Sequence, residues 1–356
     1  MIRDHQHVAE LSEKYGVNEE DIFFIALNAC GVKSDLKHPR MRFRLRLLSR
    51  PEEQFFFILA LGRTKSPFEL KEDRILFRGE LFAYVDCLED DDAVISYFRK
   101  GQKVLTLNSN ARSQCTGCIF CPNTLEDASD PRLAAIDDLE RYFAVLEAEF
   151  GRPALQELEK TTVCTGCFHE EEPALEHLER VRRVLDRRDS KSQIHFLSSV
   201  LKSAEGLDVV ADKIAPFHLT LTIECFTNRS VILKQSKANL QFEEMCQVLQ
   251  RSKERGFDTD FTYIVGLDPE EESLEKLRRV KDHVTTFPRL QVYQAHNSFM
   301  QYFAAPEATN IEFFLRMRKG IEDIFIDTDM RPQSWENYRP LWYFTFAGEE
   351  LNCARV

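Results

Sequence analysis

The sequence predicts an α/β protein built around a parallel sheet. From residue 103 onward, short β-like runs alternate with amphipathic helical runs, and six strand–helix pairs follow one another. Such alternation is typical of parallel sheets whose crossover helices cover one or both faces. Because these crossovers are right-handed, six units can curl into a partial barrel. A doubly wound open sheet is the alternative, and the sequence does not separate the two.

The six pairs occupy residues 103–326. The predicted strands cover residues 103–110, 160–164, 193–200, 218–225, 258–266 and 289–296. The helices paired with them cover residues 134–150, 173–188, 204–214, 239–255, 271–287 and 310–325. In the first of these helices the apolar residues recur at helical spacing and form one face, made of Leu139, Tyr142, Phe143 and Leu146.

Residues 1–102 lack this rhythm, and we predict a separate N-terminal region there. Residues 18–30 are expected to be helical, with acidic residues in the first turn, where the helix dipole favours them. Further runs look extended at residues 41–48, 55–61, 74–77 and 81–87. We therefore expect a small α+β region with an antiparallel sheet. Residues 327–356 are expected to cap the barrel, or alternatively to pack against its edge.

Composition excludes several classes of protein. The chain has 356 residues and a formal charge of -12, which argues against general nucleic-acid binding because phosphate contacts need a basic surface. The longest apolar run covers only residues 55–61, far short of the roughly 20 residues of a membrane helix. Ten cysteines without a secretory segment fit a reducing compartment. We therefore expect a cytoplasmic protein with no membrane attachment.

Three closely spaced cysteines follow the first predicted strand. Cys115, Cys118 and Cys121 form a C-x2-C-x2-C run, and thiolates at such spacing select iron–sulfur clusters, zinc or copper. The run matches the first three cysteines of a ferredoxin, but Leu125 stands where the fourth would fall. Three thiolates on a four-iron cluster would leave one iron open, and an open metal position is typical of a reactive site. A zinc knot is the alternative.

Polar and thiol residues also follow the other predicted strands. In barrels and open α/β folds, sites form where the carboxyl ends of the parallel strands meet. The residues at the remaining five ends are Cys164 with Cys167, Ser198 with Ser199, Glu224, Gly266 with Asp268, and His296 with Asn297. We therefore expect one site that draws on several strands.

Over roughly residues 103–300, these motifs make the chain resemble the radical S-adenosylmethionine (SAM) enzymes. The resemblance implies a partial (β/α)6 TIM-like barrel with a three-cysteine loop after its first strand. In this family an aromatic residue precedes the last cysteine, and Phe120 occupies that position. The loop departs from the family in one respect. The usual spacing is C-x3-C-x2-C, and Gln114 stands where the first cysteine normally falls.

The resemblance also implies a set of residues that contact SAM. The turn after the second strand, which holds the methionine amino group in the family, matches Gly166, Glu171 and Glu172 only loosely. Glu224 looks like the ribose contact at the end of the fourth strand. The remaining implied contacts are Arg229 and Lys234 for the methionine carboxylate and Gly266 near the adenine.

The implied function is reductive cleavage of SAM. Cys115, Cys118 and Cys121 would hold a [4Fe–4S] cluster, and SAM would bind its open iron. The 5′-deoxyadenosyl radical produced would abstract hydrogen from a small or medium organic substrate, in natural-product or cofactor biosynthesis. An external one-electron donor, a ferredoxin or flavodoxin, is implied as a partner. Neither the catalytic residues nor the reaction outcome is readable.

A second Cys-Thr-Gly-Cys sequence, from Cys164 to Cys167, leaves alternatives open. Its thiols would be unligated, would hold an auxiliary cluster with a cysteine such as Cys225, or would complete a four-thiolate centre with the first loop. The last arrangement implies a different function for the chain. The protein would then be a non-catalytic zinc protein or iron–sulfur electron-transfer protein that uses Cys115, Cys118, Cys164 and Cys167.

Overall fold

The computed structural model describes residues 1–90, 96–108, 117–121, 136–164, 168–333 and 339–351. Within these residues the main feature is a seven-stranded sheet. Its last six strands run parallel in chain order, and the first pairs antiparallel at one edge. The strands are β6 (Ser96–Arg99), β7 (Val104–Leu107), β8 (Lys160–Val163), β9 (Gln193–Ser198), β10 (Phe217–Glu224), β11 (Asp258–Val265) and β12 (Arg289–Val292).

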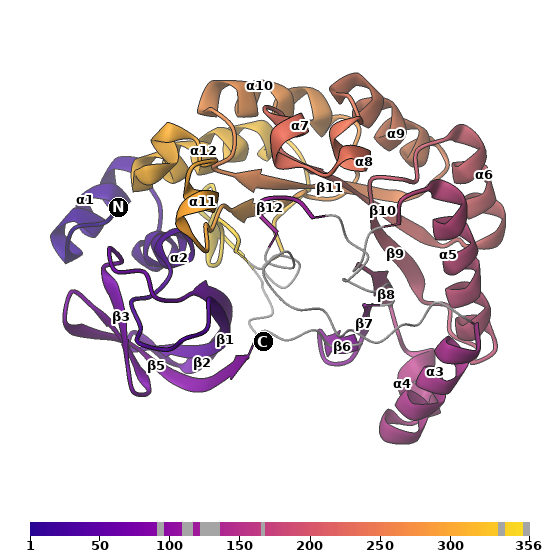
Figure 1. The fold of residues 1–356 in the computed structure, drawn as a ribbon, viewed down its shortest axis with the longest axis horizontal. Helices are drawn as coiled ribbons and strands as arrows, with labels where there is room; N and C mark the ends of the chain where they lie inside the picture. The colour runs from indigo at the N-terminus through magenta and orange to yellow at the C-terminus, as the bar shows by residue number, and fades with distance from the viewer. Residues whose placement is uncertain (91–95, 109–116, 122–135, 165–167, 334–338, 352–356) are drawn as a thin grey trace.

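The sheet curls into an open half-barrel with helices on its convex side (Figure 1). These helices are α3 (Ile136–Phe150), α4 (Arg152–Gln156), α5 (Glu171–Asp186), α6 (Ala204–Lys213), α9 (Phe242–Glu254), α10 (Glu270–Lys281) and α12 (Ile311–Phe325). This arrangement confirms the mixed α/β class with a curled, mostly parallel sheet. A doubly wound sheet would carry helices on both faces. None of the described helices combines the length and the apolar character needed to cross a membrane.

Short helices that the sequence did not predict follow two of the strands. After β10 the chain forms α7 (Arg229–Ile232) and α8 (Gln235–Ala238), and after β12 it forms α11 (Ser298–Gln301) and a 3-10 turn at Pro306–Thr309. Each is only four residues long, so it shows no helical period in the sequence. These short helices become important below because they surround the cysteine loop.

The N-terminal region contains the expected antiparallel sheet. Its strand order is β2-β1-β5-β4-β3, and two helices precede it. The elements are α1 (His5–Tyr15), α2 (Glu19–Cys30), β1 (Arg40–Leu47), β2 (Arg50–Ala60), β3 (Phe68–Lys71), β4 (Arg74–Phe77) and β5 (Glu80–Asp90). Strand β6 falls within the predicted N-terminal region, yet it pairs with β7 in the large sheet. The boundary at residue 102 therefore stays a prediction.

The described part of the C-terminal segment packs against α2 and α12. The backbone N–H of Tyr343 donates to Asp21 of α2 at 2.7 Å, and the indole N–H of Trp342 donates to Glu322 of α12 at 3.1 Å. A short hairpin of β13 (Thr345–Phe346) and β14 (Glu349–Glu350) follows. The segment thus ties the N-terminal region to the last long helix, and its role as a cap of the barrel stays a prediction.

Candidate metal and cofactor site

Cys118 and Cys121 lie in one turn. The backbone N–H of Cys121 donates to the carbonyl of Cys118 at 2.9 Å. Cys118 is buried and belongs to an apolar cluster with Cys225, Ile264 and Leu267, three residues at or near the ends of β10 and β11. The turn that carries the two thiols therefore lies against the carboxyl edge of the parallel sheet, where the sequence predicted the site.

The helices after β10 hold this turn in place. The backbone N–H of Ile119 donates to the carbonyl of Ile232, the last residue of α7, at 3.0 Å. The backbone N–H of Lys234, just before α8, points at the Cys118 sulfur at 3.5 Å. An N–H group directed at a sulfur is a recognised feature of thiolate-ligated iron–sulfur clusters. The Lys234 side chain itself is also buried.

The described residues fit a thiolate-bound metal centre in the nature and arrangement of their donors. Two thiols, which are soft donors, lie in a single turn, and one of them receives a backbone N–H. Cys115, the third predicted ligand, lies outside the described residues. Among those that are described, no group of three or more His, Cys, Asp or Glu side chains could hold a metal ion. The complete ligand set therefore stays a prediction.

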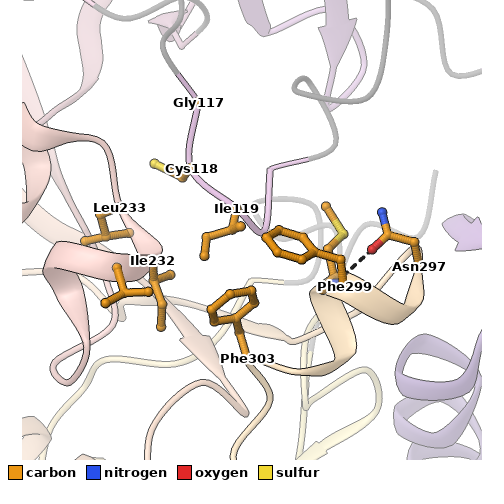
Figure 2. A pocket seen from close by; sticks show the side chains of 10 residues that line it. Gly117, Cys118, Ile119, Ile232, Leu233, Asn297, Phe299 and Phe303 are labelled. Atoms are coloured by element: carbon orange, nitrogen blue, oxygen red, sulfur yellow. Dashed lines mark hydrogen bonds between the residues drawn. The ribbon is translucent and has the colours of Figure 1, made fainter.

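An apolar cavity of about 500 Å³ adjoins the turn (Figure 2). Gly117, Cys118 and Ile119 form one wall, and residues of α7 and α11 form the others. Two phenylalanines, Phe299 and Phe303, lie edge-to-face with ring centroids 5.1 Å apart. The predicted aromatic, Phe120, packs at the border of the same apolar cluster. Cys118, which forms part of this wall, is itself only 6% exposed.

Glu224 ends β10 in an unusual backbone conformation. Its φ of 68° is left-handed, which is rare for a residue other than glycine and is often a sign of a functional constraint. The β10–β11 register shifts between Thr222 and Glu224. The Glu224 carboxylate pairs with the Lys237 ammonium at 2.6 Å, and both side chains are nearly buried. The predicted ribose contact is thus a buried ion pair at the sheet edge.

Arg229 binds the backbone at the carboxyl end of β10. Its guanidinium donates to the carbonyls of Ile223 at 2.7 Å and Lys237 at 2.6 Å, and also to the carbonyl of Cys225. Burial lowers the pKa of this guanidinium. Among the described residues only its Nε lacks a partner. Most of its donors are therefore occupied by the backbone, and its predicted contact with the methionine carboxylate stays untested.

The remaining predicted SAM contacts are spread over neighbouring loops. Glu171 accepts from the backbone N–H groups of Lys202 at 2.7 Å and Ser203 at 3.0 Å, so it caps the start of α6. Glu172 is exposed on the first turn of α5. Gly266 has a φ of 116°, and a Cβ there would lie 3.0 Å from the Cβ of Tyr293. Gly166 lies outside the described residues.

Cys164 and Cys225 occupy different surroundings. The Cys164 thiol donates to Asn108 at 3.3 Å, and burial raises its pKa to about 11. Burial also raises the pKa of the Cys225 thiol, which packs in the cluster of Cys118. Cys167 lies outside the described residues. The zinc alternative and the auxiliary cluster therefore both stay predictions.

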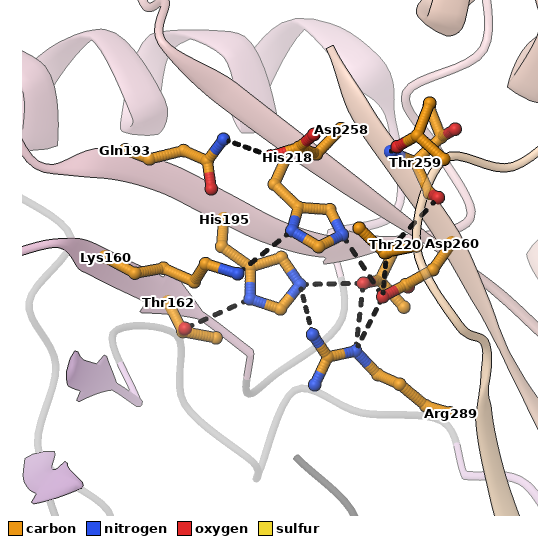
Figure 3. Close-up of polar contacts among 12 residues, drawn as sticks. Lys160, Thr162, Gln193, His195, His218, Thr220, Asp258, Thr259, Asp260 and Arg289 are labelled. Atoms are coloured by element: carbon orange, nitrogen blue, oxygen red, sulfur yellow. Dashed lines mark hydrogen bonds and ion pairs between the residues drawn. The ribbon is translucent and has the colours of Figure 1, made fainter. Parts of the chain in front are cut away.

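A buried polar network that was not predicted from the sequence lies on the concave face of the sheet, and Figure 3 shows its contacts. We call it the lumen network, and it consists of Lys160, Thr162, His195, His218, Thr220, Asp260 and Arg289. The opposite face of the same strands packs on helices, as the Tyr263 hydroxyl shows by bonding Ser273 of α10 at 2.6 Å. Because side chains alternate along a strand, the network faces the inside of the half-barrel.

The centre of the lumen network is a chain of charge-assisted contacts. Asp260 Oδ2 lies 3.1 Å from His218 Nε2 and 3.2 Å from Arg289 Nε. Burial would raise the pKa of Asp260, but the charges of Arg289 and His218 outweigh it and hold that pKa near 2. His195 is held neutral because burial and the neighbouring cations keep its pKa well below the usual value. Alternation of polar and apolar residues over 218–224 and 260–262 was the signal that could have revealed this network.

No protein-family model matches the sequence, and no curated protein matches it. The chain is similar in structure to a radical SAM methyltransferase from Sphaerobacter thermophilus, with 12% identity, 94% of each chain covered and a TM-score of 0.42. It is also similar to Streptococcus suis SuiB bound to S-adenosylmethionine, with 11% identity and a TM-score of 0.39 over 67% of this chain and 51% of SuiB.

A third similar structure is SuiB bound to precursor peptide SuiA, with 14% identity and a TM-score of 0.38 over 63% of this chain and 45% of SuiB. The chain therefore spans about half the length of the SuiB chains it matches. All of these TM-scores lie below 0.5, so we assign neither a substrate nor an activity from these similarities.

Proposed function

We propose that this chain is a radical SAM enzyme in which Cys115, Cys118 and Cys121 hold a [4Fe–4S] cluster. When bound, the cluster and SAM supply a 5′-deoxyadenosyl radical that abstracts hydrogen from an organic substrate. The observation that carries the proposal is the turn of Cys118 and Cys121, which lies against the carboxyl edge of a curled parallel sheet. That edge is where barrel enzymes place their reactive groups.

The chain's own residues would perform three tasks. The backbone N–H of Lys234 would stabilise negative charge on the Cys118 sulfur. The apolar cluster around Cys118 would keep water away from a reactive radical. The Glu224–Lys237 pair would present a fixed carboxylate to the ribose hydroxyls.

The other assignments complete the proposal. Phe120, Gly166, Glu171, Glu172, Arg229, Lys234 and Gly266 are the further proposed SAM contacts. A ferredoxin or flavodoxin would supply the electron, the substrate would be a small or medium organic molecule, and the setting would be cytoplasmic. We also propose the division into residues 1–102, 103–326 and 327–356.

Anaerobic reconstitution tests the proposal. The wild-type chain should bind about four irons and release 5′-deoxyadenosine from SAM when dithionite is added. Cys118→Ala should lose both the brown colour and the release, because one thiolate ligand is gone. Cys246→Ala is the matched control, since Cys246 is also a buried thiol and lies in α9, and it should retain both. Fully loaded wild-type protein that releases no 5′-deoxyadenosine would contradict the proposal.

A further inference from the structure

The inner face of β10 and β11 carries two successive layers of polar side chains. In the first layer Thr220 and Asp260 are register partners, and both belong to the lumen network. In the second layer Thr222 and Thr262 are register partners as well. Because side chains alternate along a strand, residues two positions apart point to the same side. The second layer therefore faces the inside of the half-barrel, one step nearer the carboxyl edge.

The second layer is buried and yet lacks hydrogen bonds. Thr222 is 7% exposed and Thr262 is 6% exposed. Among the described residues, neither hydroxyl has a hydrogen-bond partner, and the Oδ1 atom of Asp260 in the layer below has none either. A buried polar atom without a partner is unfavourable and uncommon in folded proteins. Three such atoms on adjacent strands indicate groups that a bound molecule satisfies.

The second layer lies between the cysteine turn and the lumen network. The next inner-face residue of β11 after Thr262 is Ile264, which packs in one cluster with Cys118. Two residues of a strand span roughly 7 Å, so Thr262 lies about that distance along the strand from the layer of the cysteine turn. On its other side lies the lumen network, in which Asp260 contacts His218 and Arg289. A molecule held by the second layer would therefore face the proposed cofactor.

We infer that Thr222, Thr262 and Asp260 Oδ1 bind an uncharged hydroxyl or amide group of the substrate. To call the bound molecule a substrate rests on the proposed function, whereas the existence of the binding site does not depend on it. A carboxylate oxygen only accepts, so the ligand must donate a hydrogen bond to Asp260, whereas threonine hydroxyls both donate and accept. A hydroxyl or an amide meets both demands.

Charged groups fit this position less well. A carboxylate or phosphate would lie against the negative charge of Asp260. An ammonium would be attracted by Asp260, but that carboxylate already pairs with Arg289 at 3.2 Å, and Arg289, the register partner of Thr262 on β12, would repel a second cation. Like charges at such short range in a poorly solvated interior repel strongly. The surroundings therefore favour a neutral group.

Isosteric substitution in the full chain provides the first test. Thr222→Val and Thr262→Val should each raise the Tm of the ligand-free protein by about 1–2 °C, because each removes an unpaired buried hydroxyl. Thr220→Val is the matched control on the same strand and face. Its hydroxyl bonds His195 at 2.7 Å and Arg289 at 3.2 Å, so this variant should lower the Tm. If the first two variants also lower the Tm, the fold itself uses their hydroxyls, and the inference is wrong.

Small-molecule probes provide the second test. Glucose and acetamide carry hydroxyl and amide groups, and acetate and methylammonium are their charged counterparts. Glucose or acetamide should raise the Tm of the wild type more than that of the Thr222→Val/Thr262→Val double variant. General stabilisation by a cosolute acts on both proteins and cancels in this difference. Equal responses of the two proteins to every probe, or a difference seen only with a charged probe, would overturn the inference.

Neither test requires iron or SAM, so the two proposals can fail separately. If SAM cleavage occurs while both valine variants lower the Tm, the enzyme assignment stands and the binding site does not. If the valine variants behave as expected but no 5′-deoxyadenosine forms, the site stands and the radical chemistry does not.

Discussion

Two clusters of buried charge differ in how completely their hydrogen bonds are made. The first joins α2, α12 and the C-terminal segment, and we call it the junction cluster. Asp21 accepts from the backbone N–H groups of Tyr343 and Phe344 and pairs with Arg318 at 3.1 Å. Arg318 in turn pairs with Glu322 at 2.9 Å. Among the described residues, no buried side-chain atom of Asp21, Arg318 or Glu322 lacks a partner.

The lumen network is only partly satisfied. Asp260 uses Oδ2 for His218 and Arg289, whereas its Oδ1 has no partner in the part of the chain that the structure describes. A fully bonded buried network fixes a fold, while an incomplete one carries a cost that a ligand can remove. The junction cluster is therefore built for stability, and the lumen network for binding.

Removal of the central cation should have its largest effect in the junction cluster. Arg318→Met should lower the free energy of unfolding by about 3–5 kcal/mol, because it leaves Asp21 buried without its cation and leaves Glu322 with only its pair to Lys319. Urea unfolding followed by circular dichroism measures the loss. Arg316→Met is the control on the same helix, since its pair with Glu270 is partly exposed and should contribute less than about 1 kcal/mol. Similar losses in both variants would refute the structural role of the cluster.

Replacing the arginine of the lumen network should lower the free energy of unfolding by a smaller amount. Arg289→Met leaves Asp260 in contact with His218 at 3.1 Å, so the buried carboxylate keeps a partner. We expect a loss of about 2 kcal/mol, which is in the range for hydrogen bonds to charged groups. The measurement is the same urea titration. A loss as large as that of Arg318→Met would show that the two clusters do not differ.

Acid should weaken the lumen network and spare the junction cluster. Burial, followed by the charge of Arg289, keeps the pKa of His195 well below 6.5. The unfolded chain binds that proton more readily, so the stability due to neutral His195 is present above pH 6.5 and is lost as the pH falls below it. By pH 5 the loss should reach about 2 kcal/mol.

The variant His195→Gln tests this dependence, because glutamine offers both a donor and an acceptor but does not titrate. Between pH 8 and pH 5 its stability should change by about 2 kcal/mol less than that of the wild type. Arg318→Met should keep the full wild-type pH dependence over the same range. Identical slopes for wild type and His195→Gln would contradict the assignment.

The strand–helix order could be predicted from the sequence because it depends on local patterns. Asn18 and Asn310 begin their helices by accepting backbone N–H groups, as such residues commonly do. The pairing of β6 with β7 could not be predicted, since register depends on contacts between strands. The four-residue helices α7 and α8 were missed because they are too short to show a period.

In the candidate site, too, features set by local sequence could be predicted, and features set by distant contacts could not. The cysteine spacing and the strand ends predict that Cys118 and Glu224 lie near one edge of the sheet. The sequence did not show that Glu171 would cap α6, because its partners lie about 30 residues away. Nor did it show which polar residues of β10 and β11 would lack partners, since that depends on every neighbouring strand.

The smallest expected change in stability is at His296, and it tests most directly whether buried polar groups without partners destabilise the fold. It is 8% exposed, and neither ring nitrogen has a hydrogen-bond partner among the described residues. Burial, followed by the charges of Arg339 and Arg40, lowers its pKa to about 3. His296→Leu should therefore raise the free energy of unfolding at pH 8 by about 1 kcal/mol, because it removes unpaired polar atoms from a buried position.

His195→Leu is the matched control, because the same substitution there breaks bonds to Thr162 at 3.1 Å and Thr220 at 2.7 Å. It should lower stability at pH 8 by about 2 kcal/mol, in the direction opposite to His296→Leu. Stability changes of opposite sign for the same substitution at two buried histidines would show that hydrogen-bond partners, and not burial alone, decide the effect. Buried groups with partners would then stabilise this fold, and buried groups without partners would be available to a ligand. A stability loss in both variants would mean that His296 is bonded in solution, and the distinction would then fail at that residue.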